Sequence, residues 1–246
     1  MRTLVVMPTY DEALNIVEAL TRVRAAVPDA DVLVVDDNSP DGTADLARAA
    51  AAELGQIDVL DRPKKDGLGN AYRHGFRVGL DRGYERLVQM DADLSHDPAA
   101  LPSLLAQLDV GAAAVIGSRY VPGGSIPHWP WRRRALSKWG NRYAGTVLGM
   151  SVRDATSGYR AYDASTLADI DVFSTRAKGY GFQIETAYRI ARSGRALAEV
   201  PIKFTDRVRG ESKMSVSVMI EELALVTWWG VRDRVRSLVR RPPRGR

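Results

Sequence analysis

The sequence predicts an α/β fold built on a mostly parallel sheet that helices cover on both faces. Short runs of β-branched and apolar residues alternate with segments of helical period, and this alternation is typical of parallel sheets in α/β proteins. Clusters of polar residues directly follow several predicted strands, where ligands collect in such sheets. A length of 246 residues is enough for one large domain with a substantial core.

The elements can be assigned in chain order. The predicted strands are Thr3–Met7, Asp31–Asp36, Ile57–Leu60, Arg86–Met90 and Ala113–Gly117. Amphipathic helices between them are predicted to begin near Ala13, Asp41, Gly69 and Pro98. After about Ser118 the pattern changes to proline and glycine turns, basic helices with aromatic residues, and a last strand near Leu197–Phe204. The two halves of the chain therefore differ in pattern.

Composition and charge exclude several classes of protein. The chain has no cysteine, so it has no disulfide and no cysteine nucleophile, and any metal must sit on oxygen or histidine ligands. The formal net charge is +5, and residues 232–246 carry seven arginines against Asp233 alone, so the basicity is mostly a tail. Such a tail suits an anionic membrane surface or a solubilising end. No nucleic-acid module signature accompanies it, and we expect no nucleic-acid partner.

Two apolar stretches raise the question of membrane insertion. The run after Met1 is short and stops at Pro8, which favours a first strand over a targeting peptide. Glu221 and Glu222 interrupt the best later candidate, and no stretch approaches the roughly 20 apolar residues that span a bilayer. We expect no membrane-spanning segment.

The strongest chemical signal is Asp91-Ala92-Asp93, directly after the predicted strand that ends at Met90. Two carboxylates one residue apart at a strand end can turn the same way. They then form a hard oxygen site for Mg²⁺ or Mn²⁺ that also bridges substrate phosphates. The alternative is an acidic turn that caps the helix near Pro98.

A second acidic pair, Asp36-Asp37, ends another predicted strand. A nucleotide needs a carboxylate for its base or ribose hydroxyls as well as a metal for its phosphates, so this pair favours the metal interpretation. The residues from Asn38 to Gly42 also predict an N-cap and a turn. Both interpretations can hold together.

Weaker signals point to structure. Gly67-x-Gly69 lacks the third glycine of the dinucleotide-binding fingerprint and does not follow the first strand, so it predicts a helix start. His74, His96 and His128 show no metal-ligand spacing. We expect them at the surface or as support for the site.

Five motifs occur in order along the chain: Pro8-Thr9-Tyr10-x-Glu12, Val34-Val35-Asp36-Asp37-x-Ser39-x-Asp41-Gly42-Thr43, Met90-Asp91-Ala92-Asp93-Leu94-Ser95-His96, Gly117-Ser118-Arg119-Tyr120 and Arg207-x-x-Gly210-x-Ser212-Lys213. Together they closely resemble the dolichyl/polyprenyl-phosphate mannose synthases, which are inverting family-2 glycosyltransferases with the GT-A (Rossmann-like) fold. The first three motifs are shared by the wider family 2. Four further features make the resemblance specific to the mannose synthases within family 2. They are Leu94-Ser95-His96, the basic loop ending at Lys213, Asp154-x-Thr156-Ser157-Gly158-Tyr159-Arg160 and Gly181-Phe182-Gln183-Ile184-Glu185.

The resemblance implies the roles of the motif residues. The guanine nucleoside of GDP-mannose would contact Pro8, Tyr10, Glu12, Val35 and Asp37, the diphosphate and metal would contact Asp91, Ala92 and Asp93, and phosphates would also contact Arg119, Arg207 and Lys213. Asp91, Asp93 and Arg119 would be catalytic, because a divalent cation and fixed cationic donors stabilise the charge that develops on leaving GDP. Some relatives carry Gln at the position of Ser95, and water could replace that ligand.

The implied acceptor is a polyprenyl monophosphate. A phosphate monoester is largely dianionic near neutral pH, with a second pKa of about 6, so it can attack the anomeric carbon without a general base. It needs cations to position it, and the candidates are Arg119, Arg133 and Ser137, the last two four residues apart on one predicted helix face. The alternative for Arg132-Arg133-Arg134 is a solvated surface run. A hydroxyl acceptor would instead require a base, for which Asp154 or Glu185 is the obvious choice.

We therefore expect an enzyme that transfers mannose from GDP-mannose to a polyprenyl phosphate, with another nucleotide sugar such as UDP-glucose as the alternative donor. A nucleotide-sensing or RNA-binding protein is the non-enzymatic alternative. The catalytic domain is expected over residues 1–213, divided into a nucleotide-binding part (1–118) and an acceptor-binding part (119–213). A C-terminal amphipathic helix and basic tail are expected over residues 214–246.

A lipid acceptor predicts a peripheral position on the cytoplasmic face of a membrane. Two aromatic segments are candidates for that contact. Trp131, Leu136, Trp139 and Tyr143 recur at helical spacing, as in an interfacial helix, with ordinary core packing as the alternative. Trp228 and Trp229 precede the arginine-rich end, which could contact lipid directly or dock on a separate membrane-anchoring subunit. The alternative is a helix that packs on the catalytic domain while its arginines face water.

Overall fold

The computed structural model describes residues 1–177, 179, 181–206 and 216–239, with the backbone alone at 216–222 and 236–239. The strands are β1 (Thr3–Thr9), β2 (Asp31–Asp36), β3 (Ile57–Asp61), β4 (Arg86–Gln89), β5 (Ala114–Ser118), β6 (Arg160–Asp163) and β7 (Leu197–Pro201). Among the described residues they form one sheet in the order β3-β2-β1-β4-β6-β5-β7. The five strands predicted in the first half are confirmed, and the last predicted strand ends earlier than expected, at Pro201.

One strand departs from the expected pattern. β6 lies between β4 and β5 and runs antiparallel to both, whereas the other neighbours in the sheet are parallel. β6 was not predicted because it has only four residues, begins with an arginine and ends with an aspartate, so it shows no apolar run. The mostly parallel sheet is confirmed, with this one reversed strand in its second half.

Helices cover both faces of the sheet. One core cluster packs under α1 (Ile16–Ala26), α2 (Thr43–Leu54) and α4 (Leu101–Asp109), the last preceded by the short helix η1 (Pro98–Ala100). The cluster on the other face packs under α3 (Leu68–Asp81), α6 (Ala164–Asp169) and α7 (Gly181–Arg192), with the short helix η2 (Val172–Ser174) after α6. These layers hold the carboxyl ends of β1, β2 and β4 at one edge, as predicted.

Helix α3 lies unusually close to the strands because two of its residues are glycines. A Cβ atom on Gly75 would lie 2.3 Å from Cγ1 of Val6, and one on Gly79 would lie 2.3 Å from Cδ2 of Leu87. Real side chains do not approach so closely. The close contact places the first turn of α3 beside the end of β4.

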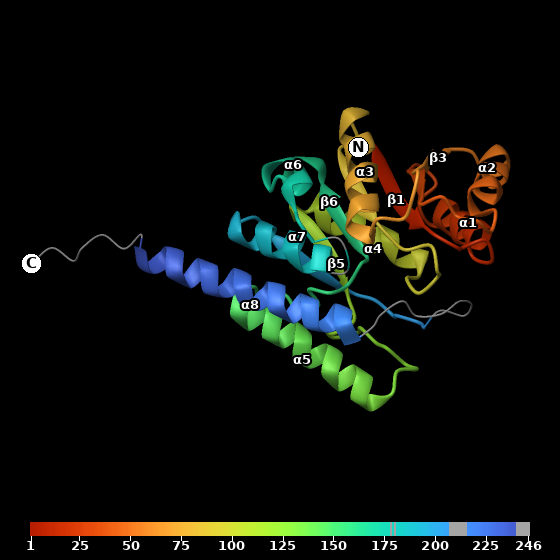
Figure 1. The fold of residues 1–246 in the computed structure, drawn as a ribbon. Helices are drawn as coiled ribbons and strands as arrows, with labels where there is room; N and C mark the ends of the chain where they lie inside the picture. Colours follow the sequence, from red (N-terminus) through yellow and green to blue (C-terminus); the bar gives the residue numbers. More distant parts are fainter. Residues whose placement is uncertain (178, 180, 207–215, 240–246) are drawn as a thin grey trace, which may run out of the picture.

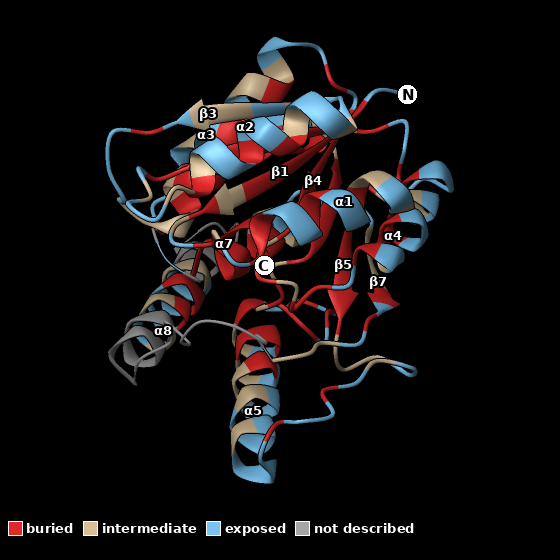
Figure 2. Ribbon diagram, turned by 90° about the vertical axis from the view of Figure 1, so that its right-hand side faces the viewer, coloured by how far each residue is buried: buried red, intermediate tan, exposed pale blue. Residues whose placement is uncertain are grey.

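A helix pair extends from this body. Helix α5 (Trp131–Leu148) packs against α8 (Val216–Val239), and the two run side by side away from the sheet (Figure 1). The last turns of α5 are buried with parts of α7 and α8 in a third apolar cluster. Its first turns are exposed (Figure 2). Among the described residues, no helix combines the length and apolar character needed to cross a membrane.

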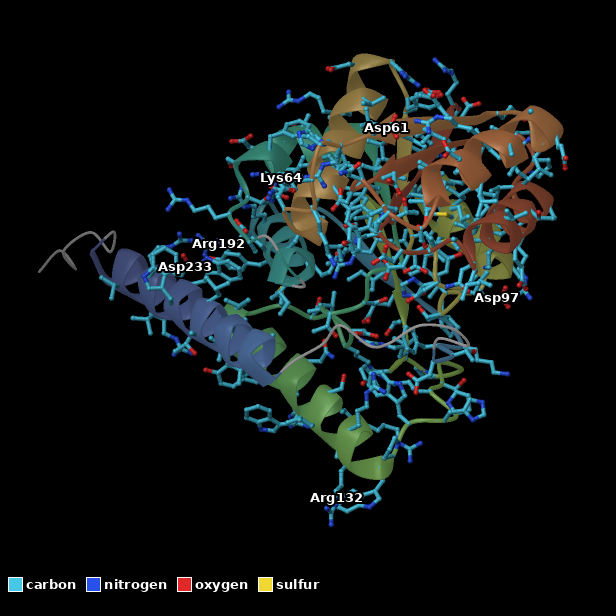
Figure 3. All side chains as sticks on the ribbon, turned by 45° about the vertical axis from the view of Figure 1, so that its right-hand side comes forward. Asp61, Lys64, Asp97, Arg132, Arg192 and Asp233 are labelled. Atoms are coloured by element: carbon cyan, nitrogen blue, oxygen red, sulfur yellow. The ribbon has the colours of Figure 1, made fainter. Side chains whose placement is uncertain are left out.

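The aromatic residues of this pair divide between surface and core. Trp131 and Trp139 are 68% and 53% exposed, so ordinary core packing is wrong for both. Trp228 is also exposed, but its neighbour Trp229 is buried and stacks on Tyr188 with a ring distance of 6.0 Å. Tyr188 belongs to α7 and Trp229 to α8. An ion pair joins the same two helices, since Arg192 of α7 lies 3.2 Å from Asp233 of α8 (Figure 3). The second half of α8 is therefore fixed to the body by a ring stack, an ion pair and a hydrogen bond from the hydroxyl of Tyr188 to Asp233.

Candidate active site

The carboxylates that follow β4 are both held in place by hydrogen bonds. The hydroxyl of Tyr72 on α3 donates to Oδ1 of Asp91 at 2.8 Å. The amide and hydroxyl of Ser95 donate to Oδ1 of Asp93 at 3.0 and 2.6 Å. Leu94, between Asp93 and Ser95 in the chain, has a φ of 60°. This left-handed conformation costs a non-glycine residue roughly 1–2 kcal/mol. This local strain at the strand end is typical of functional turns.

These carboxylates do not cap the following helix. The side chain of Asp97 does so, by accepting from the amide of Ala99 at 3.0 Å. The alternative of an acidic capping turn is therefore wrong for Asp91 and Asp93. Burial and the charge of Asp91 raise the pKa of Tyr72 well above its ordinary value, so its hydroxyl keeps the proton that it donates.

The residues present fit a divalent cation with few protein ligands. Within the described residues, no group of three or more histidine or carboxylate side chains is arranged to hold a metal. Asp91 and Asp93 line one cavity and supply hard oxygen atoms, so the remaining ligands would come from phosphate oxygens and water. Nδ1 of His96 is 4.0 Å from Oδ2 of Asp91. Burial lowers the pKa of His96, which favours the neutral imidazole as a supporting group.

The two residues of the second acidic pair, Asp36 and Asp37, have different contacts. Asp36 accepts from the hydroxyl of Thr9 at 2.8 Å and from the amide and hydroxyl of Ser39 at 2.8 and 2.6 Å, so it builds the predicted turn. Asp37 forms a buried ion pair with Arg62. Burial raises the pKa of Asp37 although Arg62 opposes the shift.

The other predicted nucleoside contacts gather at the same edge of the sheet. Pro8 pairs with Val35 across β1 and β2, and the ammonium of Lys65 lies 4.0 Å from the ring centroid of Tyr10. Glu12 is buried and accepts from the side-chain amide of Asn15 at 2.8 Å. Ala92 lies in the core, 2% exposed. Arg207 and Lys213 lie outside the described residues.

Arg119 and Asp154 form a buried ion pair where the two halves of the chain meet. Nε and Nη2 of Arg119 donate to the two carboxylate oxygens of Asp154, each at 2.7 Å. Burial alone would raise the pKa of Asp154, but the guanidinium outweighs it and the pKa is lowered. Glu185 accepts from the backbone amides of Arg176 and Ala177 and pairs with Arg189. Both carboxylates considered as a base are therefore engaged in holding the structure.

One cavity of about 430 Å³ joins the carboxylates to the helix pair. Its polar end contains Asp91, Asp93, His96, Arg119 and Gln183, and its apolar wall contains Leu136, Trp139, Tyr143, Ile184, Leu223 and Val226. The predicted acceptor residues Arg133 and Ser137 also line it. A charged group at the polar end and a hydrocarbon chain at the wall would thus fit one continuous space.

The three arginines at the start of α5 differ in environment. Arg132 and Arg134 are exposed. Arg132 points away from the body at the N-terminal tip of α5 (Figure 3). Arg133 lies 3.9 Å from the ring centroid of Trp129 and 3.3 Å from Oδ1 of Asp206. Ser137 accepts from the hydroxyl of Tyr120 at 2.7 Å. The solvated-run interpretation therefore holds for Arg132 and Arg134, while Arg133 faces the cavity.

Three residues of the site were not predicted with a role. Tyr72 has the helical spacing of an ordinary core aromatic residue, and Arg62 directly follows β3. Neither position indicated a functional role in the sequence. Gln183 belongs to a motif that narrowed the family resemblance, but no chemistry was assigned to it. Conversely, the cavity lining among the described residues does not include the nucleoside group at the ends of β1 and β2.

Residues 4–171 match the model of glycosyl transferase family 2. The chain is 50% identical over 238 residues to an undecaprenyl-phosphate mannosyltransferase of Micrococcus luteus, covering 97% of this chain and 98% of that protein. It is 49% identical over 243 residues to a polyprenol monophosphomannose synthase of Mycolicibacterium smegmatis, covering 97% and 92%. A mannosyltransferase from Pyrobaculum calidifontis, solved with GDP-Man and Mn²⁺, superposes with a TM-score of 0.60 at 19% identity, covering 96% of this chain and 64% of that one. At that identity the likeness concerns the fold alone, which is GT-A.

Proposed function

The chain belongs to glycosyl transferase family 2, and on that premise we propose that it transfers mannose from GDP-mannose to a polyprenyl monophosphate with inversion at the anomeric carbon. The observation that carries this proposal is the shape of the cavity, in which Asp91, Asp93, Arg119 and Arg133 open onto an apolar wall built by α5, α7 and α8. A lipid phosphate has the same division into a charged head and a hydrocarbon tail. The names of the two relatives of about 50% identity support the same donor sugar and acceptor class.

The roles of the site residues follow from their environments. Asp91 and Asp93 would hold a divalent cation, Mg²⁺ or Mn²⁺, which supplies positive charge against the leaving GDP when bound. Tyr72 and Ser95 fix the two carboxylates. Arg133 and Ser137 would hold the acceptor phosphate beside Arg119. Pro8, Tyr10, Glu12, Val35 and Asp37 would bind the guanine nucleoside at the ends of β1 and β2.

The acceptor chemistry does not require a base from the protein. A phosphate oxygen near neutral pH already carries negative charge, so it can attack the anomeric carbon directly while GDP departs. Asp154 and Glu185 are bound to arginines and backbone amides, which makes them poor proton acceptors. This arrangement favours a phosphate over a sugar hydroxyl as the acceptor.

The proposal is tested with a panel of radiolabelled nucleotide sugars and a short-chain polyprenyl phosphate. We expect label to move from GDP-mannose into an organic-extractable product, in a reaction that EDTA stops and added Mg²⁺ or Mn²⁺ restores. Transfer from UDP-glucose instead would overturn the donor, and transfer only to a hydroxyl acceptor would overturn the acceptor. An absence of transfer from every donor, with nucleotide binding retained, would favour a nucleotide-sensing protein.

We also propose that the enzyme works on the cytoplasmic face of a membrane as a peripheral protein. The exposed side chains of Trp131, Leu136 and Trp139 lie on the helix that forms the apolar wall of the cavity. An interfacial helix presents such residues to the headgroup region. Contact at this helix would bring the cavity to the lipid surface. A separate membrane-anchoring subunit that covers the same residues is the alternative partner.

A further inference from the structure

The amide of Gln183 is a buried polar group that the described part of the chain leaves without a partner. Gln183 lies in the first turn of α7 and is 1% exposed. Among the described residues neither its Oε1 nor its Nε2 has a hydrogen-bond partner. Native proteins pair almost all buried polar side chains, so each exception requires an explanation. Because this amide lines the cavity, a bound ligand can supply the missing partner.

Gln183 faces the same small space as the metal-binding end of the site. A Cβ atom built on Gly158 would lie 3.5 Å from Oδ2 of Asp91, 3.6 Å from Cε1 of His96 and 3.7 Å from Nε2 of Gln183. Nδ1 of His96 is likewise buried without a hydrogen-bond partner. Three polar side chains, two from the segment after β4 and one from α7, thus converge on a space that Gly158 leaves open.

The backbone around this space is fixed by one buried arginine. Arg160 on β6 is 1% exposed and donates from Nη1 to the carbonyl of Gln183 at 2.7 Å. Its Nε donates to the carbonyl of Ser157 at 2.8 Å, and its Nη2 to that of Ala155 at 2.6 Å. Arg160 therefore ties the start of α7 to the turn that contains Gly158, and acts as a positioning residue for both.

The chemistry of the space identifies the class of ligand. A carboxamide offers two N–H donors and one carbonyl acceptor, which suits a hydroxyl group that both donates and accepts. Phosphate oxygens only accept, so they would leave the carbonyl oxygen of Gln183 without a donor. The transferred hexose is the part of the proposed donor that carries hydroxyls next to the diphosphate. Its anomeric carbon must lie close to the phosphate that Asp91 and Asp93 bind through a cation.

We infer that Gln183, with Gly158 and His96, forms the subsite that binds a ring hydroxyl of the transferred hexose and selects the donor sugar. This inference rests on the proposed function, and it assigns recognition of the donor sugar to Gln183. A site built to hydrogen-bond a substrate hydroxyl discriminates strongly against a donor whose hydroxyl points elsewhere, because the buried polar groups are then left unpaired. Mannose and glucose differ in the configuration of one such hydroxyl, so GDP-mannose and GDP-glucose are the matched probes.

The main test is Gln183→Met, which keeps the length of the side chain and removes both polar atoms. We expect kcat/KM for GDP-mannose to fall about 10- to 100-fold, and the preference for GDP-mannose over GDP-glucose to shrink with it. The affinity for GDP alone, measured by calorimetry, should not change, because GDP lacks the sugar. The melting temperature should stay level or rise, since removing an unpaired buried polar group does not destabilise a core. Gln107→Met on α4 is the matched control and should behave as wild type.

Gly158→Ala provides an independent variant. Its backbone conformation accepts alanine, and the added methyl group contacts its neighbours at ordinary distances, so the chain should fold while the space is filled. We expect a higher KM for GDP-mannose and an unchanged affinity for GDP.

The outcomes separate this inference from the function that it rests on. Wild-type kcat/KM and wild-type donor preference in Gln183→Met would overturn the inference and leave the proposed function intact. A loss of GDP affinity equal to the loss of kcat/KM would also overturn it, since it would place Gln183 in the nucleotide site. A wild-type chain that transfers no mannose would overturn the proposed function, and the inference with it.

Discussion

The two halves of the chain, proposed to bind the nucleotide (1–118) and the acceptor (119–213), hold several of their charged groups in different ways. In the first half each important carboxylate is fixed by a neighbour, Asp91 by Tyr72, Asp93 by Ser95 and Asp37 by Arg62. In the second half Arg119 is held as firmly by Asp154, but Arg133 is 40% exposed and its partner Asp206 is 41% exposed. The apolar wall is formed by a helix pair that extends from the body (Figure 1).

The difference corresponds to the two proposed substrates. A nucleoside diphosphate has one size and charge in every turnover, so fixed donors and acceptors bind it with little reorganisation. A polyprenyl chain is long, flexible and apolar, and only its phosphate needs a defined position. The fixed half would therefore control the chemistry, and the open half would admit the lipid. Four experiments test this contrast.

The largest effect is expected in the fixed half, from Asp93→Ala. Removing a carboxylate from a divalent-cation site should abolish transfer, a loss of more than about 10³-fold, while the melting temperature shows that the fold remains. Asp61→Ala, an exposed carboxylate at the end of β3, is the control and should stay active. Full activity of the Asp93 variant in EDTA would show that the reaction does not depend on a metal at this site.

The second comparison uses two ion pairs of similar chemistry and different burial. Asp154→Ala leaves Arg119 buried and uncompensated, so the free energy of unfolding should fall by about 3–5 kcal/mol. Asp206→Ala breaks a half-exposed pair and also removes the acceptor of the Trp129 indole N–H at 2.7 Å, so it should cost less, about 1–2 kcal/mol. Urea denaturation of both variants measures the difference. Both pairs lie in the second half, so similar losses in the two variants would remove the distinction between fixed and open charged groups there.

The third experiment separates acceptor from donor. Arg133→Ala removes a charge-assisted hydrogen bond to the acceptor phosphate, a loss of about 1.5–3 kcal/mol in the use of polyprenyl phosphate, or roughly 10- to 150-fold. The affinity for GDP measured by calorimetry should barely change. Arg132→Ala, which removes the same charge from the exposed face of α5, is the control. An equal loss of GDP affinity would move Arg133 to the nucleotide site.

The smallest effect concerns the membrane, where salt screens the contact. Each basic residue near an anionic surface contributes roughly 1 kcal/mol, and this attraction decays over a Debye length. A chain that ends at Thr227 should therefore co-sediment several-fold less with anionic liposomes at low salt, and the difference should shrink as salt rises. That chain also loses Trp229, which packs on Tyr188, so its folding is checked by thermal melting.

The outcomes of the liposome experiment assign the anchor. Equal binding of the full-length and shortened chains would exclude the tail and favour α5. Trp131→Ser and Trp139→Ser would then be expected to reduce binding. If no chain binds liposomes, a separate membrane subunit becomes the expected partner.

The sequence predicted the first half well because its signals are local. A strand followed by Asp91-Ala92-Asp93 places both carboxylates at the sheet edge whatever the rest of the chain does, and the structure places them there. The residues that fix those carboxylates were harder to predict. Tyr72 contacts Asp91 from a helix 19 residues earlier in the chain, and a tyrosine at helical spacing looks like any core residue.

The second half was predicted less completely because its elements are short or depend on distant contacts. β6 has four residues with charged ends, so no apolar pattern reveals it. Trp228 and Trp229 are adjacent and similar in the sequence, yet only Trp229 is buried, since successive residues on a helix point about 100° apart and Tyr188 lies on one side alone. The helical spacing of the aromatic residues on α5 fits both a surface and a core position. Which of them are exposed depends on where α8 packs.

The close approach of α3 to the sheet has a consequence for engineering thermostability. Replacing helical glycines by alanine commonly stabilises a protein, since glycine costs a helix interior roughly 1 kcal/mol relative to alanine. At Gly75 and Gly79 the added methyl group would meet Val6 and Leu87 at 2.3 Å, and α3 would have to move outward. Tyr72 lies one turn before Gly75, so the phenol that fixes Asp91 would move with it. Gly140 of α5, whose Cβ would meet no atom within 4 Å, has room for the same replacement, and α5 could gain stability there without moving the residues that hold Asp91 and Asp93.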